Sequence, residues 1–217
     1  MSSVLSRMQS LLTQLYDAPV AHDVANYVLS DRRRVAHLTG EECTTDEQVL
    51  LVEDQGEVRV GVFIDPAVLD RLEHRDPWDA LEDGNLQDYC TALEGVSHFH
   101  YLMWNLERNR GVSLLELELQ ADVDKYASAV KLMTEQGAGT FPLSLHFRLF
   151  GRVGYLPQLS SEARGRYEEA NRYAARFCRS LEERFLRQRR SRPEEWVAEL
   201  RRFFRRGHQA KLRALTL

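Results

Sequence analysis

Four side chains of the kinds that bind metal ions lie close together in the sequence. Glu94 and His98 are four residues apart, as are Glu118 and Asp122, and this spacing puts each pair on one face of a helix. A short link centred near residue 110 joins the two segments, so the helices should run antiparallel. His98 lies about 12 residues before that centre and Asp122 about 12 residues after it. We therefore expect the four side chains to converge at the same level along the two helix axes.

This set predicts a divalent metal cofactor bound by Glu94, His98, Glu118 and Asp122. One imidazole with two or three carboxylates suits a hard or borderline divalent cation, and helix pairs in bundle cores commonly carry such ligands. Lys125 extends the second helix and would orient an anionic substrate, while Glu94 or Glu118 serves as general base. The candidate catalytic residues are therefore these four ligands and Lys125.

The same residues have simpler interpretations, which the sequence leaves open. Carboxylates at these positions also suit a solvated helix face, and His98 can form hydrogen bonds within a packed interior. Asp122 and Lys125 have the spacing of a surface ion pair, which is common on helices. Because the set lacks a defined motif such as His-Glu-x-x-His, its spacing alone favours the simpler interpretations.

Several familiar catalytic designs are absent from the sequence. It contains no Gly-x-Gly-x-x-Gly or Walker phosphate loop, no Gly-x-Ser-x-Gly elbow, and no paired Cys or His at zinc spacing. Ser97 and His98 are neighbours, which point apart on a helix, so they do not form a nucleophile and its base. These absences argue against nucleotide hydrolases, dinucleotide oxidoreductases and serine hydrolases of familiar design.

Two long helices, over residues 86–108 and 113–136, must position the candidate site. Separately, β-branched runs at residues 49–52 and 58–64 flank a glycine-containing turn and predict a small antiparallel β-hairpin. The predicted fold class is therefore α+β, predominantly helical, with a central antiparallel helical hairpin. We expect that hairpin to bury Leu93, Val96, Leu102, Leu106, Leu119, Val123 and Val130.

Shorter elements precede the helical hairpin. Apolar residues at helical spacing predict helices over residues 4–16 and 20–29, and the polar run at residues 30–34 should end the second. Asp65 is placed to cap a short helix that has Pro66 as its first residue.

Further elements follow the helical hairpin. Strict alternation of apolar and polar residues over residues 141–149 predicts a strand, which Pro142 would confine to a sheet edge. A helix is expected from residue 160 or 161 to about residue 190, and a last one from Pro193 until Gly207 ends it.

Length and composition describe an ordinary globular chain. Of its 217 residues, 43% are hydrophobic, and no apolar run approaches the roughly 18 residues of a membrane span. The N-terminus lacks the features of a secretory signal, and no Cys-x-x-Cys pair occurs, so we expect a soluble, cytoplasmic protein with reduced thiols. An excess of 26 Arg over 3 Lys fits a GC-rich, bacterial genome.

We expect one domain over residues 1–217, although the polar connection near residue 76 allows a subdivision into 1–76 and 77–217.

Charge is distributed unevenly along the chain. Residues 1–161 carry 13 basic and 25 acidic side chains, whereas residues 162–217 carry 16 basic and 8 acidic ones. The basic end can fold back on the acidic body, or it can meet nucleic acid or an acidic partner. Its apolar stripe should dock the last helices on the body and leave an exposed arginine face, comprising Arg187, Arg189, Arg190, Arg201, Arg202, Arg205 and Arg206.

Two functions are consistent with these features. The leading prediction is a binding or adaptor subunit of a larger system, with a protein partner, with nucleic acid as a further candidate at the arginine face, and without membrane contact. The alternative is a metal-dependent enzyme that acts on a phosphoester or other anionic substrate through the Glu/His/Asp cluster. Ligand side chains gathered in a concave pocket would favour the enzyme, whereas side chains splayed into solvent would contradict it.

Overall fold

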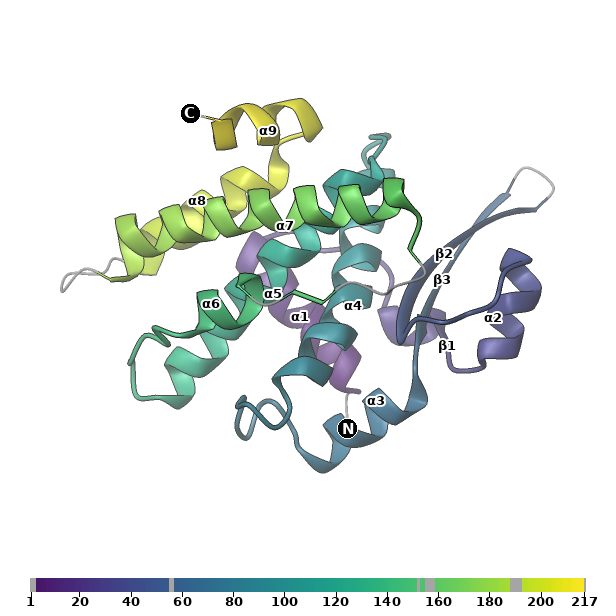
Figure 1. The fold of residues 1–217 in the computed structure, drawn as a ribbon, viewed down its shortest axis with the longest axis horizontal. Coiled ribbons are helices and arrows are strands. Elements are labelled where there is room, and N and C mark those ends of the chain that lie inside the picture. The colour runs from purple at the N-terminus through teal and green to yellow at the C-terminus, as the bar shows by residue number, and fades with distance from the viewer. Residues whose placement is uncertain (1–2, 55–56, 152, 155–158, 188–192, 217) are drawn as a thin grey trace.

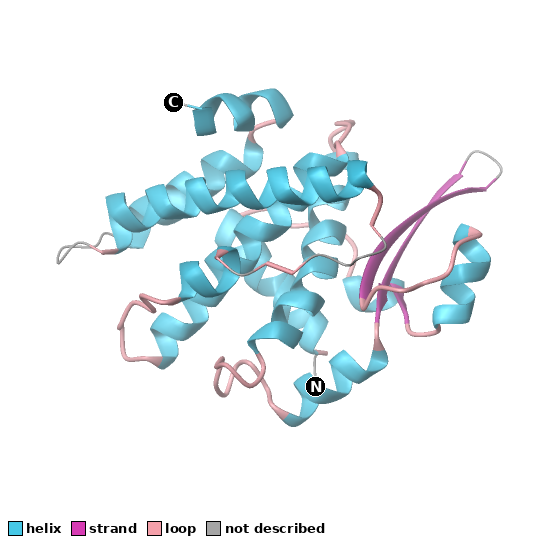
Figure 2. Cartoon of the chain, in the orientation of Figure 1, coloured by secondary structure: helices cyan, strands magenta, loops and turns pink. Residues whose placement is uncertain are grey.

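The computed structural model describes residues 3–54, 57–151, 153–154, 159–187 and 193–216, which form a predominantly helical molecule with one small sheet (Figures 1 and 2). The predicted α+β class is therefore confirmed, and the first helix and the helix after Asp65 begin where expected. The strands are β1 (Val28–Leu29), β2 (Glu47–Asp54) and β3 (Glu57–Ile64). A 3-10 helix, η1 (Val24–Tyr27), precedes β1, and a π-helical turn, η2 (Glu182–Leu186), follows α7. The α-helices are α1 (Val4–Tyr16), α2 (Arg32–Thr39), α3 (Pro66–His74), α4 (Leu86–Leu106), α5 (Leu114–Gln136), α6 (Leu145–Phe150), α7 (Ser161–Leu181), α8 (Pro193–Arg205) and α9 (His208–Thr216).

The antiparallel pair α4 and α5 forms the predicted centre of the fold. Helix α5 begins where the Ser113 hydroxyl accepts a hydrogen bond from the amide of Glu116, which satisfies a free N–H group of the first turn. Six of the seven residues predicted to be buried in this pair are at most 5% exposed. The prediction for Leu106 was wrong, since its side chain is 46% exposed. Leu106 is the last residue of α4, so the apolar stripe continues past the covered part of the helix.

The β-hairpin packs against α4. Strands β2 and β3 pair antiparallel, as predicted, with Glu47 opposite Ile64 at one end, and β1 adds parallel to β3 in the order β1-β3-β2. Gly95 of α4 permits this close packing, because a Cβ atom there would lie 2.9 Å from Cγ1 of Val62 and 3.1 Å from Cγ of Glu47. The first residue of β2 is therefore held against α4.

The helix predicted over residues 20–29 is absent. This segment holds η1 and β1, and α2 begins at Arg32 with Asp31 as its N-cap, within the polar run that was expected to end a helix. Long-range contacts override the local pattern here. Strand β1 pairs with β3, and the guanidinium of Arg32 binds the carboxylate of Asp65.

The alternating segment 141–149 is not the predicted strand. Its second half belongs to α6, which buries Leu145 completely, and Nε2 of His146 donates a hydrogen bond to the carbonyl of Ala175 in α7 at 2.8 Å. Pro142 has no amide hydrogen to donate, and the described part of the chain places no strand beside this segment. Alternation without a pairing partner does not produce a strand.

The C-terminal helices dock on the body, as predicted. Trp196 is 6% exposed, and Phe203 and Phe204 are fully buried. The ring of Phe204 stacks on Tyr16 of α1 at 4.4 Å and meets Trp104 of α4 edge-on at 5.0 Å. Docking thus fixes α8 against both the first helix and the central pair.

Two other expectations concern the C-terminal region and the thiols. The long helix predicted to reach residue 190 is α-helical as far as Leu181 and is followed directly by the π-helical turn η2, which ends at Leu186. Residues 188–192 lie outside the described part of the chain. Helix α9, which follows Gly207, was not predicted. The three cysteines are buried free thiols, with Cys178 in the core as expected. None of the described helices combines the length and apolar composition needed to cross a bilayer.

Candidate metal centre

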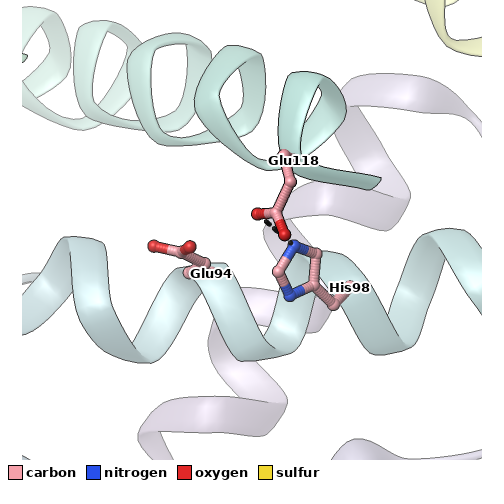
Figure 3. A group of neighbouring side chains, drawn as sticks. All are labelled: Glu94, His98 and Glu118. Atoms are coloured by element: carbon pink, nitrogen blue, oxygen red, sulfur yellow. Dashed lines mark ion pairs between the residues drawn. The ribbon is translucent and has the colours of Figure 1, made fainter. Parts of the chain in front are cut away.

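Glu94, His98 and Glu118 come together between α4 and α5 (Figure 3). Each residue offers one ligand atom, and these three atoms lie within 4.8 Å of one another. Glu94 and His98 are one turn apart on α4, and Glu118 points toward the imidazole from α5. Three of the four predicted metal ligands are therefore adjacent, because the antiparallel pair brings the two helix faces together.

Asp122, the fourth predicted ligand, pairs with Lys125. The Nζ atom of Lys125 is 2.7 Å from Oδ1 of Asp122 and 3.1 Å from Oε2 of Glu94. The spacing had suggested a surface pair, but the Lys125 and Asp122 side chains are only 17% and 16% exposed. Burial alone would lower the pKa of Lys125, but Asp122 and Glu94 raise it well above its ordinary value. Lys125 is thus a fixed positive charge that holds Glu94 beside His98.

The imidazole of His98 lies between two carboxylates. Its Nδ1 atom is 3.4 Å from Oε1 of Glu47, and its Nε2 atom is 3.5 Å from Oε2 of Glu118. The His98 side chain is 8% exposed, and Nε2 finds no hydrogen-bond partner among the described residues. In metal sites a carboxylate commonly accepts the second ring N–H of a ligating histidine and so fixes its tautomer. Glu47 is placed for that role, which leaves Nε2 beside Glu118.

Glu47 was not found by sequence analysis. It is the first residue of β2 and is 51 positions from His98, so no local spacing connects the two. Its side chain is only 12% exposed, and the packing of β2 at Gly95 places it over the imidazole. Glu47 also lies two residues before the β-branched run at residues 49–52 that predicts the strand, so its position did not indicate a partner.

The charges of the cluster compensate one another. Burial alone would lower the pKa of His98, but the carboxylates of Glu118 and Glu47 raise it well above its ordinary value. For Glu94, burial acts to raise the pKa, but the positive charges of Lys125 and His98 outweigh this effect, and the pKa is lowered. An imidazolium therefore occupies the centre of the cluster when no other cation does. Binding of a metal ion at Nε2 would displace that proton.

A cavity of about 740 Å³ opens over the cluster. Its floor carries Glu47, Glu94, Glu118, Asp122 and Lys125, and its walls come from α4, α6, α7 and the segment after α6. Arg148 in the wall is already paired with Asp83. Tyr167 lines the cavity from α7, and burial, followed by the carboxylates of Glu118, Glu94 and Glu47, raises its pKa. Its phenol group is therefore neutral and can donate a hydrogen bond.

The three ligand atoms fit a divalent cation after a small adjustment. With bond lengths of about 2.1 Å, the ligands of a tetrahedral ion stand about 3.4 Å apart, and the three atoms here lie within 4.8 Å of one another. Glu94, His98 and Glu118 would then each move inward by less than about 1 Å. Three protein ligands leave coordination positions free toward the cavity, as in catalytic rather than structural sites.

The predicted arginine face is largely engaged with the protein itself. Arg187 binds the buried carboxylate of Glu182 at 2.7 Å, and Arg201 donates to the carbonyls of Gln14 and Leu15. Arg205 donates to the carbonyl of Asp17 at 2.9 Å. Arg202, which pairs with Glu199, keeps 62% of its side chain exposed, and Arg206 is half-buried. Arg189 and Arg190 lie outside the described residues. The basic end thus folds back on the body at several points.

The cluster, its buried imidazole and the cavity above it are the features from which a function can be argued. Comparisons of this chain with protein-family models, with curated proteins and with solved structures give no match.

Proposed function

We propose that this chain is a metal-dependent enzyme with Glu94, His98 and Glu118 as its metal ligands, acting on a phosphoester or other anionic substrate bound in the cavity. The observation that carries the proposal is the Nε2 atom of His98. It is buried, lies 3.5 Å from Oε2 of Glu118 and makes no hydrogen bond among the described residues, and the carboxylates of Glu94 and Glu118 beside the ring line a cavity of about 740 Å³. A buried polar atom without a hydrogen bond is costly in a folded protein, and a metal ion at this position would take the place of the imidazolium proton between the ring and the carboxylates.

The remaining groups have complementary roles in this proposal. A bound divalent cation would polarise the substrate and lower the pKa of a coordinated water. Glu118 lies beside that position and can accept the proton of the water, and Tyr167 can donate a hydrogen bond to the substrate. Lys125 was expected to orient the substrate, but its ammonium is held by Glu94 and Asp122. We assign it instead to fixing those two carboxylates.

Metal titration of purified, metal-free protein tests this proposal. We expect one divalent ion, Mn²⁺ by electron paramagnetic resonance or Zn²⁺ by calorimetry, to bind the wild type, and His98→Ala to weaken binding at least about 100-fold because it removes the only nitrogen ligand. Glu47→Gln should weaken it about 10-fold to 100-fold, since it removes the carboxylate behind the imidazole. The control is His37→Ala, an exposed position on α2, which should bind as the wild type does. Equal binding by the wild type and His98→Ala would reject the centre.

A second candidate function is a binding role at the basic C-terminal face. Its support is the exposure of Arg184 and Arg202, whose side chains are 54% and 62% exposed around the shared carboxylate of Glu199. The sequence-based prediction of a bacterial, cytoplasmic adaptor with a protein partner belongs to this candidate.

Nucleic-acid binding at that face has a direct test. The logarithm of affinity for single-stranded or double-stranded DNA or RNA should fall linearly with the logarithm of salt concentration, as counterion release requires. Absence of binding at low salt would remove nucleic acid and leave an acidic partner or self-association at this face.

A further inference from the structure

Lys211 of α9 is fully buried, although lysine is one of the residues least often found inside proteins. Its Nζ atom donates hydrogen bonds to the hydroxyl of Tyr101 at 2.9 Å and to Oε1 of Gln120 at 2.7 Å. The same atom lies 4.3 Å from the ring centre of Tyr101 and 5.0 Å from that of Phe203. Lys211 therefore inserts from the last helix between α4, α5 and α8.

Each side chain that accepts a hydrogen bond from Lys211 also donates one to a buried carboxylate. The Tyr101 hydroxyl donates to Glu116 at 2.5 Å, and the Gln120 amide donates to Asp124 at 2.6 Å. Within the described residues no carboxylate pairs directly with Lys211, so one neutral group separates its nitrogen from each negative charge. The positive form of Lys211 is thus only partly compensated.

Asp124 has further partners that hold it in place. Its carboxylate also accepts hydrogen bonds from Tyr16 of α1 at 2.5 Å and from Ser97 of α4 at 2.6 Å. The network around Lys211 therefore joins α1, α4, α5 and α9. Because Asp124 is held by hydrogen bonds from α1, α4 and α5, Lys211 is the member of the network that moves with α9.

Hydrogen-bond capacity favours the neutral amine at this position. A neutral amine has two N–H donors, and Lys211 has two acceptors in range. The third N–H group of an ammonium has no further acceptor among the described residues, although cation–π attraction to the rings of Tyr101 and Phe203 partly opposes the loss of its charge. Burial lowers the pKa of Lys211 to about 7, although Glu116 and Asp124 act to raise it, and Arg110 in the link between α4 and α5 lowers it further.

Other contacts of α9, which follows α8 at the C-terminal end of the molecule (Figure 1), involve α7 and the start of α5. Among its described side chains Leu215 is the other buried one, at 3% exposure. Arg176 of α7 donates a hydrogen bond to the Leu215 carbonyl at 2.6 Å, and His208 contacts the Ser113 hydroxyl at 3.0 Å. Lys211 is therefore one of the two buried side chains through which the described part of α9 docks.

We infer that α9 docks on the α4–α5 pair with release of a proton from Lys211, so that pH sets how tightly the C-terminal helix is held. The undocked lysine is exposed and titrates near 10.5, whereas the docked one titrates near 7. Between these two values the undocked form carries one more proton, so the docking constant should rise up to about tenfold per pH unit as pH increases. Below about pH 7 both forms are protonated, and this lysine adds no further pH dependence. The inference is independent of the metal centre.

Pulsed hydrogen exchange of the full chain, read by mass spectrometry, tests this inference. After correction for intrinsic exchange rates, the protection of α9 amides in the wild type should be roughly 50-fold higher at pH 9 than at pH 7. Lys211→Met keeps the length of the side chain without an ionisable group, so its protection should not change between the two pH values. Amides of α5, followed in the same sample, separate local release of α9 from unfolding of the whole protein.

Leu215→Ala is the matched control on the same helix. It removes buried apolar contact, so protection of α9 should fall by a similar factor at both pH values and retain its rise with pH. A wild type whose α9 protection is the same at pH 7 and pH 9 would overturn the inference. A Lys211→Met protein whose α9 protection still rises between pH 7 and pH 9 as in the wild type would also overturn it. If the methionine variant does not fold, Lys211→Gln takes its place in this test.

Discussion

Replacing Lys125 with methionine is expected to lower the free energy of unfolding by on the order of 3 kcal/mol. Lys125 is the ammonium between Asp122 and Glu94, at 2.7 and 3.1 Å, and these side chains are at most 25% exposed. Methionine preserves much of the apolar stem but leaves two largely buried carboxylates without their common cation. Urea denaturation of metal-free wild type and variant, compared at constant m-value, measures the difference.

Lys131→Met is the control for this variant. Lys131 lies six positions further along α5 and pairs with Glu135, whose side chain is 58% exposed, so its loss should cost less than about 1 kcal/mol. Addition of Mn²⁺ should restore part of the stability of Lys125→Met, because a cation can then balance the released carboxylates. If the two lysine variants lose equally little stability, the ion pairs of Lys125 do not hold the floor of the cavity.

Leu119→Ala is expected to destabilise the fold by about 2 to 5 kcal/mol. Leu119 lies in α5 one residue beyond Glu118 and is 1% exposed in the main core. Truncation removes buried apolar surface and leaves a void that close-packed neighbours fill only in part. The loss should appear as a lower denaturation midpoint in urea, with an unchanged m-value.

Leu106→Ala provides the matched comparison, with the same change on the partner helix. Since Leu106 is 46% exposed, its truncation should alter stability by no more than about 0.5 kcal/mol. A similar loss at the two positions would mean that the central pair is not the core on which the fold depends.

The sequence was informative where one element carries its own signal. Helices α4 and α5 are long enough for the apolar period to identify them, and a four-residue spacing placed Glu94 with His98. The predicted register was wrong by about one turn, since Glu118 and not Asp122 lies beside His98. By contrast, residues 20–29 and 141–149 were misassigned because their structure depends on neighbours. The first segment becomes partly a strand by pairing with β3, and the second has no described strand to pair with.

The missed residues share a physical cause. Glu47 contacts His98 across 51 positions, and Lys211 contacts Tyr101 across 110. Sequence patterns assign charged side chains to the surface by default, and only the tertiary contacts bury these two. Exposure of the arginine face is confirmed for Arg187, Arg202 and Arg205, but the contacts of this face with the body were missed. The carbonyls that bind Arg201 and Arg205 belong to the distant end of α1 and the residue that follows it.

Gly95 has a consequence for how the chain could be divided. A glycine in the middle of α4 costs that helix about 1 kcal/mol relative to alanine, and what it permits is contact with Val62 and Glu47. These two residues precede the polar connection near residue 76, whereas Glu94, His98 and Glu118 follow it. The candidate centre is therefore built from residues of both segments. A fragment ending at residue 76 would carry the carboxylate without its imidazole, and the complementary fragment would carry the ligands without the group that orients them.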